Sequence, residues 1–425
     1  MPNTATAPHK HPSLLGGAMI IAGTAIGAGM LANPTATSGV WFLGSLVLML
    51  YVWFSMFTSG LMILEANLNY EAGASFHTIV NDLLGKHWNI ITGLAVAFTL
   101  YMLTYAYIFV GGNATAAGLE KLLSSVTGTP TKVYEVLGSS VFLLVLGFLV
   151  WLSTKTVDRI STVLIGGMII SFFLSTGSLL SHASLPILLD SHTSSGQSYW
   201  QYIWVALPVC VSSFGFHGNV PSLVNYYNRN TAKIVKCIFL GSFLSLVIYI
   251  LWQFAVQGNL PRNNFAPVIA ADGDVKVLLG ALSAYISTKG VSTLLDAFAY
   301  MAISSSFLGV TLGLFDYIAD MFKFANTAGG RFKAALITFL PPYIAFIVAP
   351  TGFVNAMGYV GAVAAIWAAL VPALLVIASR KKYPKANYRV YGGNFMVGFV
   401  MVFAALAFFS QVFAMLKWLP KYAGL

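Results

Sequence analysis

The sequence predicts an all-α integral membrane protein with eleven transmembrane helices. Hydrophobic residues make up 58% of the 425 residues, charged residues make up 8%, and the mean hydropathy is +0.81. No soluble domain buries that much apolar surface. Apolar runs of about 20 residues, the length that crosses a bilayer, lie at Ser13–Ala32, Trp41–Leu68, Trp88–Asn113, Tyr134–Ser153, Arg159–Ser181, Trp200–Asn225, Lys236–Gln257, Val291–Ile318, Phe332–Ala349, Gly352–Ala378 and Phe395–Leu416.

The basic residues divide unequally between the two sides of the predicted membrane. With the N-terminus in the cytoplasm, 15 of the 22 Lys and Arg residues lie inside and 7 lie outside, as the positive-inside rule demands. The inner set is Lys10, Lys86, Lys155, Arg159, Arg229, Lys233, Lys236, Lys323, Arg331, Lys333, Arg380, Lys381, Lys382, Lys385 and Arg389. The outer set is Lys121, Lys132, Arg262, Lys276, Lys289, Lys417 and Lys421. The net charge of +10 therefore reflects topology and contact with anionic lipid at 380–385, not nucleic-acid binding.

The first apolar run has a glycine-rich second half. Residues 23–30 read G-T-A-I-G-A-G-M, and Asn33 and Pro34 follow. Glycine supports a helix interior weakly and frees the backbone to leave helical geometry. Inside hydrocarbon, non-helical backbone persists only where it is buried in protein or lines a cavity. This segment therefore predicts a broken first helix and a binding site at mid-membrane, which is typical of a transporter.

The sixth apolar run repeats this pattern. Residues 212–221 read S-S-F-G-F-H-G-N-V-P, so paired glycines are again followed by Asn and then Pro. The two runs are five apart, which indicates a repeat of five helices, and because five is odd the second copy must be inverted. Close helix packing is the alternative for each run alone, since Gly23 and Gly27 form a G-x-x-x-G step. The matching positions favour a site between discontinuous helices 1 and 6.

Three parts of the chain follow from this pattern. Residues 1–12 form a cytoplasmic N-terminal tail, and 13–380 form a ten-helix inverted-repeat transport core, with repeats at about 13–181 and 200–380. Residues 381–425 form a basic loop and the eleventh helix, which places the C-terminus in the periplasm. Between spans, we expect an interfacial helix within Glu71–His87 and an amphipathic helix within Asn259–Gly290 that covers the outer mouth.

Five segments carry a resemblance to a known family. They read G-T-A-I-G-A-G-M at 23–30, L-M-I-L-E-A-N-L-N-Y at 61–70, L-T-Y-A-Y-I at 103–108, S-F-G-F-H-G-N-V-P-S-L at 213–223 and S-S-F-L-G-V-T-L-G-L-F-D-Y at 305–317. Over nearly its whole length the chain resembles the bacterial tryptophan permeases of the aromatic amino acid permease family, in the amino acid/polyamine/organocation superfamily. The resemblance implies the LeuT-type 5+5 fold plus one helix, and proton-coupled uptake of tryptophan or a close aromatic relative across the bacterial inner membrane.

An amino acid substrate is a zwitterion, so its burial requires partners for both charges. A broken helix offers free N–H groups and a positive dipole end to the carboxylate, and free carbonyl groups to the ammonium. We expect the backbone of Ala28, Gly29 and Met30 to bind the carboxylate. The candidates for the ammonium are Gly23, Thr24, Ala25, Ser212 and Ser213. The hydroxyl of Thr24 has an alternative role, a bond back to the preceding turn.

The indole of tryptophan needs flat apolar walls and an acceptor for its N–H group. On the third span, Tyr101 and Tyr105 lie near the middle of an aromatic face, and they are candidates for the pocket. Packing is the alternative, because membrane spans are rich in aromatic residues. Phe214 and Phe216 flank a glycine of the sixth span, and Phe216 is the expected gate or stacking ring.

Acids and histidines inside a membrane are costly and usually functional. Glu65 resembles the helix-two glutamate of LeuT-type transporters, which braces unwound helix six; here the brace would bind at 215–218, and proton carriage is the alternative. His217 is a proton carrier or a histidine bonded to a backbone carbonyl.

The fifth span departs from the resemblance. The family carries a lysine there, in place of a sodium ion, where this chain has Met168. The departure leaves Ser305 and Ser306, near the place of a sodium site, without that partner, and it keeps sodium-coupled and exchange mechanisms open. We expect no metal, no cofactor and no catalytic residue. A membrane enzyme would need a nucleophile–base pair or metal cluster, and a channel would need a continuous polar lining.

Overall fold

The computed structural model describes residues 13–27, 29–191, 198–285, 290–349 and 352–424, and all of its regular elements are helical. The long helices are α3 (Trp41–Asn67), α5 (Lys86–Thr127), α6 (Glu135–Leu152), α7 (Thr154–His182), α11 (Thr231–Gln257), α14 (Val291–Met321), α15 (Ala328–Val348) and α18 (Gly393–Met415). Among the described residues, two spans each consist of a pair of shorter helices: α1 (Leu14–Ala25) with α2 (Gly29–Ala36), and α9 (Ile203–Ser212) with α10 (Val220–Tyr226).

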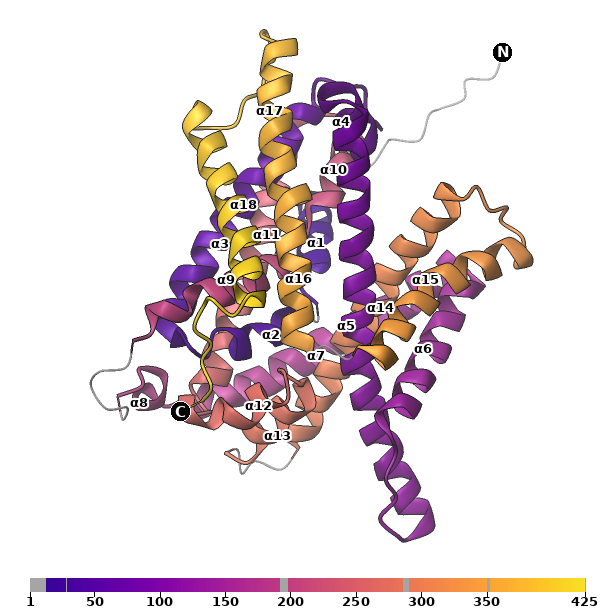
Figure 1. Cartoon of the computed structure of the whole chain (residues 1–425), viewed down its shortest axis with the longest axis vertical. Helices are drawn as coiled ribbons and strands as arrows, with labels where there is room; N and C mark the ends of the chain where they lie inside the picture. Colours follow the sequence, from indigo (N-terminus) through magenta and orange to yellow (C-terminus); the bar gives the residue numbers. More distant parts are fainter. Residues whose placement is uncertain (1–12, 28, 192–197, 286–289, 350–351, 425) are drawn as a thin grey trace, which may run out of the picture.

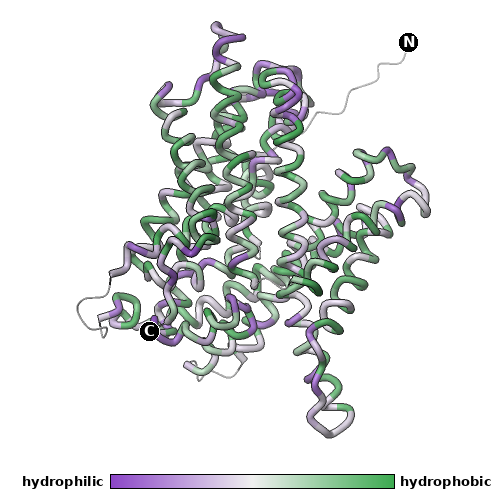
Figure 2. Tube along the Cα trace, viewed as in Figure 1, coloured by the Kyte–Doolittle hydropathy of each residue, from purple (hydrophilic) through white to green (hydrophobic). Residues whose placement is uncertain are grey.

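Ten helical segments of the described residues are long and apolar enough to cross a membrane, and the bent pair α1 and α2 makes an eleventh when it is counted as one span. The protein is therefore a multi-pass membrane protein. In Figure 2 the apolar residues follow the helices, while the polar residues gather at helix ends and in loops. The tenth span consists of α16 (Phe353–Ala365), a π-helical turn at Ile366–Leu370 and α17 (Val371–Lys382).

In Figure 1, α3, α11, α17 and α18 stand upright around α1 and α9, whereas α6 and α15 lean away on one flank. Glycine allows the closest approaches: a Cβ atom at Gly241 of α11 would lie 2.5 Å from the carbonyl oxygen of Ala18 in α1. A Cβ atom at Gly361 of α16 would collide with the backbone of Pro208 in α9. The core therefore holds the two interrupted spans against α11 and α16.

The third span is longer than the sequence indicated. We expected it to end at Asn113, but α5 continues to Thr127 and stops at Gly128, whose left-handed backbone (φ +71°) caps the helix. Helix-forming residues between these positions extend α5 beyond the apolar run, and Figure 1 shows it projecting beside α6.

Both short helices expected between the spans are present. The interfacial helix is α4 (Phe76–Leu84), which buries Ile79 and Val80. The outer connection holds a 3₁₀ turn at Arg262–Phe265, α12 (Ala266–Ala270) and α13 (Val275–Ser283). α13 packs against α2, α5 and α14. α4 lies at one end of the molecule, and α8 (Leu185–Leu188), α12 and α13 lie at the other (Figure 1).

Candidate functional site

The first span changes direction in its glycine-rich segment. α1 ends at Ala25, and Ile26 leaves helical geometry with φ −75° and ψ 106°. α2 begins at Gly29, and its axis is bent by 55° from that of α1. Ala28, an expected ligand of the carboxylate, lies outside the described residues. The Met30 N–H, another expected carboxylate ligand, donates to the carbonyl oxygen of Gly27 at 3.2 Å.

The sixth span loses its α-helical geometry over the expected residues. α9 stops at Ser212, a 3₁₀ turn spans His217–Asn219, and α10 follows with Pro221 in its first turn. Proline fits the first turn of a helix because it needs no N–H partner there. The intervening residues therefore present backbone groups outside a regular helix.

Side chains join the two interrupted spans directly. Ser213 Oγ donates to Asn33 Oδ1 of α2 at 3.0 Å. On the other side of the break, Asn219 Nδ2 donates to Thr24 Oγ1 at 2.5 Å. The Thr24 hydroxyl itself donates to the Ile20 carbonyl at 2.8 Å, so it makes the back-bond that was the alternative reading and also accepts from the sixth span. The structure thus brings Thr24, Ser213 and their neighbours together.

Tyr249 of α11 completes this junction. Its hydroxyl lies 2.5 Å from the carbonyl oxygen of Ala25 and 2.6 Å from that of Ser213. Both carbonyls stand at the C-terminal end of a half-helix, where backbone acceptors lack intrahelical partners. Sequence reasoning missed this residue. The signal was present, because Ser242, Ser245 and Tyr249 form a polar stripe at helical spacing in an apolar span.

The eighth and third spans also reach the first break. A Cβ atom at Gly27 would collide with Ser306 Oγ of α14, and Ser306 is the hydrogen-bond partner of the Tyr107 side chain of α5. Ser305 donates to the Ala302 carbonyl at 3.2 Å within its own helix. Ser306 therefore lies beside the break in the first span, and Tyr107 is a second residue that sequence reasoning missed.

Open space adjoins one side of the paired breaks. Gly23, Thr24, Gly215 and Gly218 are exposed although they lie in the middle of apolar spans. A Cβ atom added at Gly23 or Gly218 would meet nothing within 4 Å. On the α2 side the packing is dense: Gly29 is buried, and its added Cβ atom would lie 3.6 Å from Ser213 Cα. The arrangement offers backbone polar groups beside free volume.

The aromatic and hydroxyl side chains of the sixth span mostly pack into the scaffold. Phe214 is fully buried and meets the Tyr249 ring edge to face at 5.1 Å. Phe216, the expected gate, is fully buried against α3, where an added Cβ atom at Gly60 would lie 2.8 Å from its ring. Ser212 donates to the Val209 carbonyl at 2.7 Å within its own helix.

His217 occupies a closed aromatic niche. Its ring stacks on Phe216 at 4.6 Å and meets Trp367 edge to face at 6.3 Å. Nε2 lies 3.1 Å from the Met56 carbonyl oxygen, so it carries the hydrogen of this bond. Nδ1 is buried and has no hydrogen-bond partner among the residues that the structure describes. The bond to a backbone carbonyl, one of the two roles expected for His217, is therefore present.

Comparisons with known proteins decide the family. The model of the tryptophan/tyrosine permease family matches residues 10–411. The chain belongs to this family. It is 60% identical to a tryptophan-specific transport protein of Haemophilus influenzae, over 98% of this chain and 99% of that one. It is 43% identical to a low affinity tryptophan permease of Escherichia coli, over 99% of this chain and 100% of that one.

A solved structure shares the fold. The manganese transporter of Eremococcus coleocola superposes with a TM-score of 0.58 and covers 99% of this chain and 91% of its own. The sequences are 12% identical, so this likeness concerns the fold alone.

The two expected tyrosines of this permease face away from the break. Tyr101 donates to the Ile337 carbonyl of α15 at 2.8 Å, and Tyr105 donates to the Ala349 carbonyl at 3.4 Å. Residues i and i+2 of an α-helix are about 200° apart around its axis, so Tyr107 lies on the opposite face of α5 from Tyr105. The face of α5 that carries Tyr101 and Tyr105 thus packs against α15. Tyr107, on the other face, bonds to Ser306 beside the first-span break.

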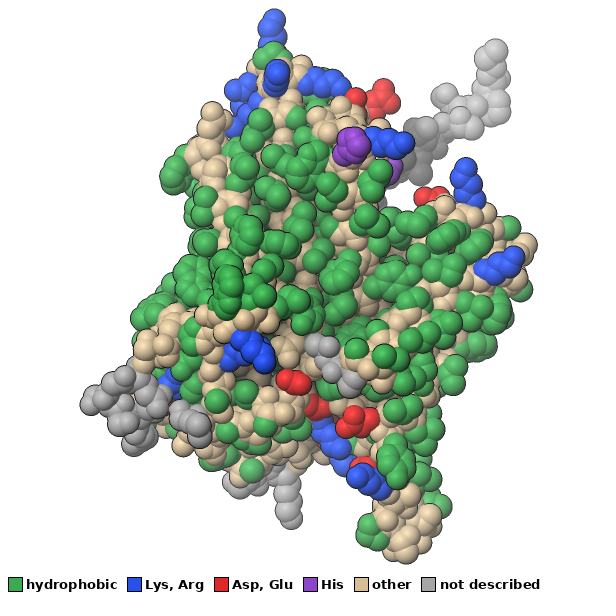
Figure 3. Space-filling model, in the orientation of Figure 1, with side chains coloured by type: hydrophobic (Ala, Val, Ile, Leu, Met, Phe, Trp, Pro, Cys, Tyr) green, Lys and Arg blue, Asp and Glu red, His purple; other side chains and the backbone are tan. Residues whose placement is uncertain are grey.

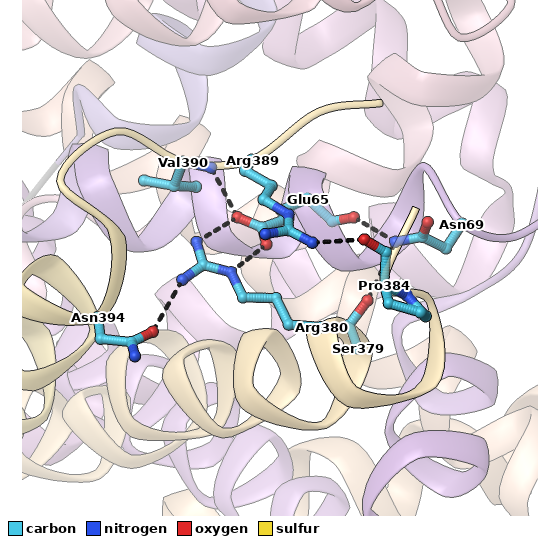
Figure 4. Close-up of polar contacts among 8 residues, drawn as sticks. All are labelled: Glu65, Asn69, Ser379, Arg380, Pro384, Arg389, Val390 and Asn394. Atoms are coloured by element: carbon cyan, nitrogen blue, oxygen red, sulfur yellow. Dashed lines mark hydrogen bonds and ion pairs between the residues drawn. The ribbon is translucent and has the colours of Figure 1, made fainter. Parts of the chain in front are cut away.

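Glu65 is bound elsewhere than expected (Figure 4). Its carboxylate accepts from Arg380 Nε at 2.7 Å, from Arg380 Nη2 at 3.0 Å and from the Val390 N–H at 2.6 Å. It braces the loop between α17 and α18, not the backbone at 215–218. Arg380 lay in the basic segment, and the sequence alone did not show that the permease would fold this loop back onto α3.

The fifth span carries an apolar residue where the family's lysine was expected. Met168 is buried, and the neighbouring Gly167 allows close packing against α14, since its added Cβ atom would lie 2.5 Å from Met301 Sδ. No cationic side chain of α7 lies at this level of the permease in the part of the span that the structure describes.

Proposed function

We propose that this permease imports tryptophan, or a closely related aromatic amino acid, by proton symport across the bacterial inner membrane. The core would be a LeuT-type 5+5 inverted repeat with an additional eleventh helix, and the N-terminus would lie in the cytoplasm. Tyrosine remains a competing substrate, because a tyrosine permease of Enterobacter agglomerans is 38% identical over 97% of this chain.

The observation that carries this proposal is the junction at Tyr249. One hydroxyl group contacts the last carbonyl of α1 and the first carbonyl beyond α9. Two half-helices that meet in this way concentrate acceptor groups at mid-span, where an ammonium group would otherwise have no partner. Gly23 and Thr24 adjoin the open space on this side.

The carboxylate would bind at the start of α2. Gly29 begins this helix, and the positive end of a helix favours an anion. Ser213 lies beside Gly29 and is oriented by Asn33. The aromatic side chain would then extend towards the exposed residues Gly215 and Gly218, away from the packed α2 side.

The proposal of proton coupling is supported by the resemblance to the permease family and by the position of His217. Its Nδ1 atom has no hydrogen-bond partner in the described part of the chain, so protonation there would change the charge beside the proposed site. Glu65, in contrast, is neutralised by Arg380 and would act through the stability of the α17–α18 loop. Sodium coupling or exchange is the second candidate, which Ser306 beside Gly27 and the apolar Met168 favour.

Uptake by the purified chain in proteoliposomes tests the proposal. Labelled tryptophan should accumulate under an inward proton gradient, and a protonophore should abolish the accumulation. Competition by unlabelled tyrosine, phenylalanine and indole ranks the substrates. Accumulation driven by a sodium gradient alone would show that sodium, and not the proton, is the coupling ion. Absence of tryptophan transport under every gradient would reject the proposed function.

A further inference from the structure

A cavity lies at one end of the molecule, outside the junction where the two interrupted spans meet. It has a volume of about 600 Å³ and lies between the end of α3, the turn from α10 to α11 and the loop from α17 to α18. Figure 3 shows Lys and Arg side chains gathered at the end of the molecule where α17 ends. Its lining consists of Glu65, Leu68, Asn69, Arg229, Thr231 and residues 382–388. None of these residues belongs to the proposed substrate site.

The charges that line this cavity leave an excess of positive charge. Glu65 is the one acidic lining residue, and its carboxylate is saturated by Arg380 and the Val390 N–H. Lys382 pairs with Asp82 of α4 at 2.7 Å at the rim. Among the described residues, neither Arg229 nor Lys385 forms an ion pair, and Lys385 is exposed. The cavity therefore attracts an anion.

The backbone reinforces this attraction. Thr231 lines the cavity and is the first residue of α11, whose N-terminal end carries a partial positive charge. Asn228 and Arg229 adopt φ values of +45° and +62°, a left-handed turn that is unusual for arginine. The turn directs the Arg229 guanidinium to the Leu68 carbonyl at the cavity wall. Such strain is typical of functional positions.

We propose that this cavity binds the phosphate of an anionic phospholipid headgroup. The cavity lies where α3 and α17 end, which is the level of the headgroups for helices that cross a bilayer. Leu68, Tyr383 and Tyr388 supply apolar and aromatic surface beside the cations, as expected at a membrane interface. A bound headgroup would join the α10–α11 turn, which follows the sixth-span interruption, to the loop that Glu65 holds.

Binding can be measured on the full chain in neutral detergent. Short-chain phosphatidylglycerol is titrated, and bound lipid is read by native mass spectrometry alongside the melting temperature. Phosphatidylcholine is the zwitterionic control, and inorganic phosphate and glycerol 3-phosphate are the soluble probes. Wild-type protein should bind phosphatidylglycerol and be stabilised by it, with little response to the other three.

Variants locate the site. Lys385→Gln should weaken phosphatidylglycerol binding about fivefold, the loss expected for one interfacial cation. Lys333→Gln, which removes an exposed cation of α15 outside the cavity, should bind like the wild type. Arg229→Gln should lose at least as much as Lys385→Gln, and Arg229→Lys should retain most of the binding. If Arg229→Gln does not fold, binding by Lys385→Gln still tests the proposal.

Three results would overturn the proposal. Wild-type affinity of Lys385→Gln for phosphatidylglycerol would show that the lipid does not bind in this cavity. An equal loss in Lys333→Gln would show that any surface cation attracts the lipid. Displacement of the lipid by inorganic phosphate or glycerol 3-phosphate would make a soluble phosphate the ligand in place of a headgroup.

Discussion

The hydroxyl of Tyr249 lies 2.5 Å from the carbonyl oxygen of Ala25, the last residue of α1. The same hydroxyl lies 2.6 Å from the carbonyl oxygen of Ser213, just beyond α9. A phenol has one hydrogen to donate, so it serves the two half-helices by alternation or by sharing. An ammonium group has three hydrogens and would satisfy both carbonyls at once. Tyr249 therefore occupies a position where a substrate cation would compete for the same acceptors.

Tyr249→Phe should impair tryptophan uptake while the protein stays folded, because the two half-helices lose the hydroxyl that joins them. The change leaves two buried carbonyls without their donor, which costs about 1–3 kcal/mol of stability. Uptake in proteoliposomes and thermal melting measure the two effects. Tyr317→Phe is the matched control, because its hydroxyl donates to the Gly93 carbonyl at 3.3 Å between α14 and α5. Full uptake by Tyr249→Phe, or an equal loss in the control, would contradict the role of this junction.

Gly29→Val should prevent tryptophan binding without unfolding the chain. The Cβ atom of an alanine fits here, since its nearest neighbour would be Ser213 Cα at 3.6 Å. The two γ-carbons of valine would extend into the junction of α2 with Ser213, where the carboxylate is proposed to bind. Equilibrium binding of labelled tryptophan should therefore be lost in Gly29→Val and largely kept in Gly29→Ala. Undiminished binding in the valine variant would exclude a carboxylate site at α2.

The sequence predicted an all-helical membrane protein with about this many spans, because apolar length is a local signal. The two glycine patterns lie where α1 ends at Ala25 and where α9 ends at Ser212. The sequence did not show which face of α5 packs against α15. Tyr101, Tyr105 and Tyr107 are chemically alike, and their orientation depends on where α15 packs. The sequence likewise did not reveal the partner of Glu65, because Arg380 lies 315 residues away along the chain and the two meet only in the folded protein. The expected N-terminal tail, residues 1–12, and Ala28 lie outside the residues that the structure describes.

Glu65→Gln should destabilise the protein by about 3 kcal/mol, because it leaves the Arg380 guanidinium without its bidentate partner in a largely buried position. The folded fraction should still accumulate tryptophan under a proton gradient, since this carboxylate braces the α17–α18 loop. Denaturant unfolding and proteoliposome uptake report the two properties separately. Loss of gradient-driven accumulation with unchanged stability would instead assign proton carriage to Glu65.

His217→Gln should separate exchange from accumulation. The glutamine amide reaches the position of Nε2 and keeps a donor for the Met56 carbonyl, but it removes the proton-accepting Nδ1 atom. Exchange of labelled for unlabelled tryptophan should continue and become independent of pH, while concentrative uptake should fail. Gradient-driven accumulation at the wild-type level would show that the coupled proton binds elsewhere.

Asp82 of α4 should make the attachment of this helix sensitive to acid. Hydrogen bonds from Lys382 and then from Tyr70 hold the pKa of Asp82 below its ordinary value. A group with a depressed pKa stabilises the folded state at neutral pH, and this contribution is lost as the pH falls through the folded-state value. Asp82→Asn should therefore speed hydrogen exchange of the α4 amides at pH 7, and the difference from wild type should vanish in acid. Because both side chains of the Lys382–Asp82 pair are more than 40% exposed, the effect should also weaken in high salt. A difference that persists in acid would show that a contact other than this ion pair holds α4 against α17.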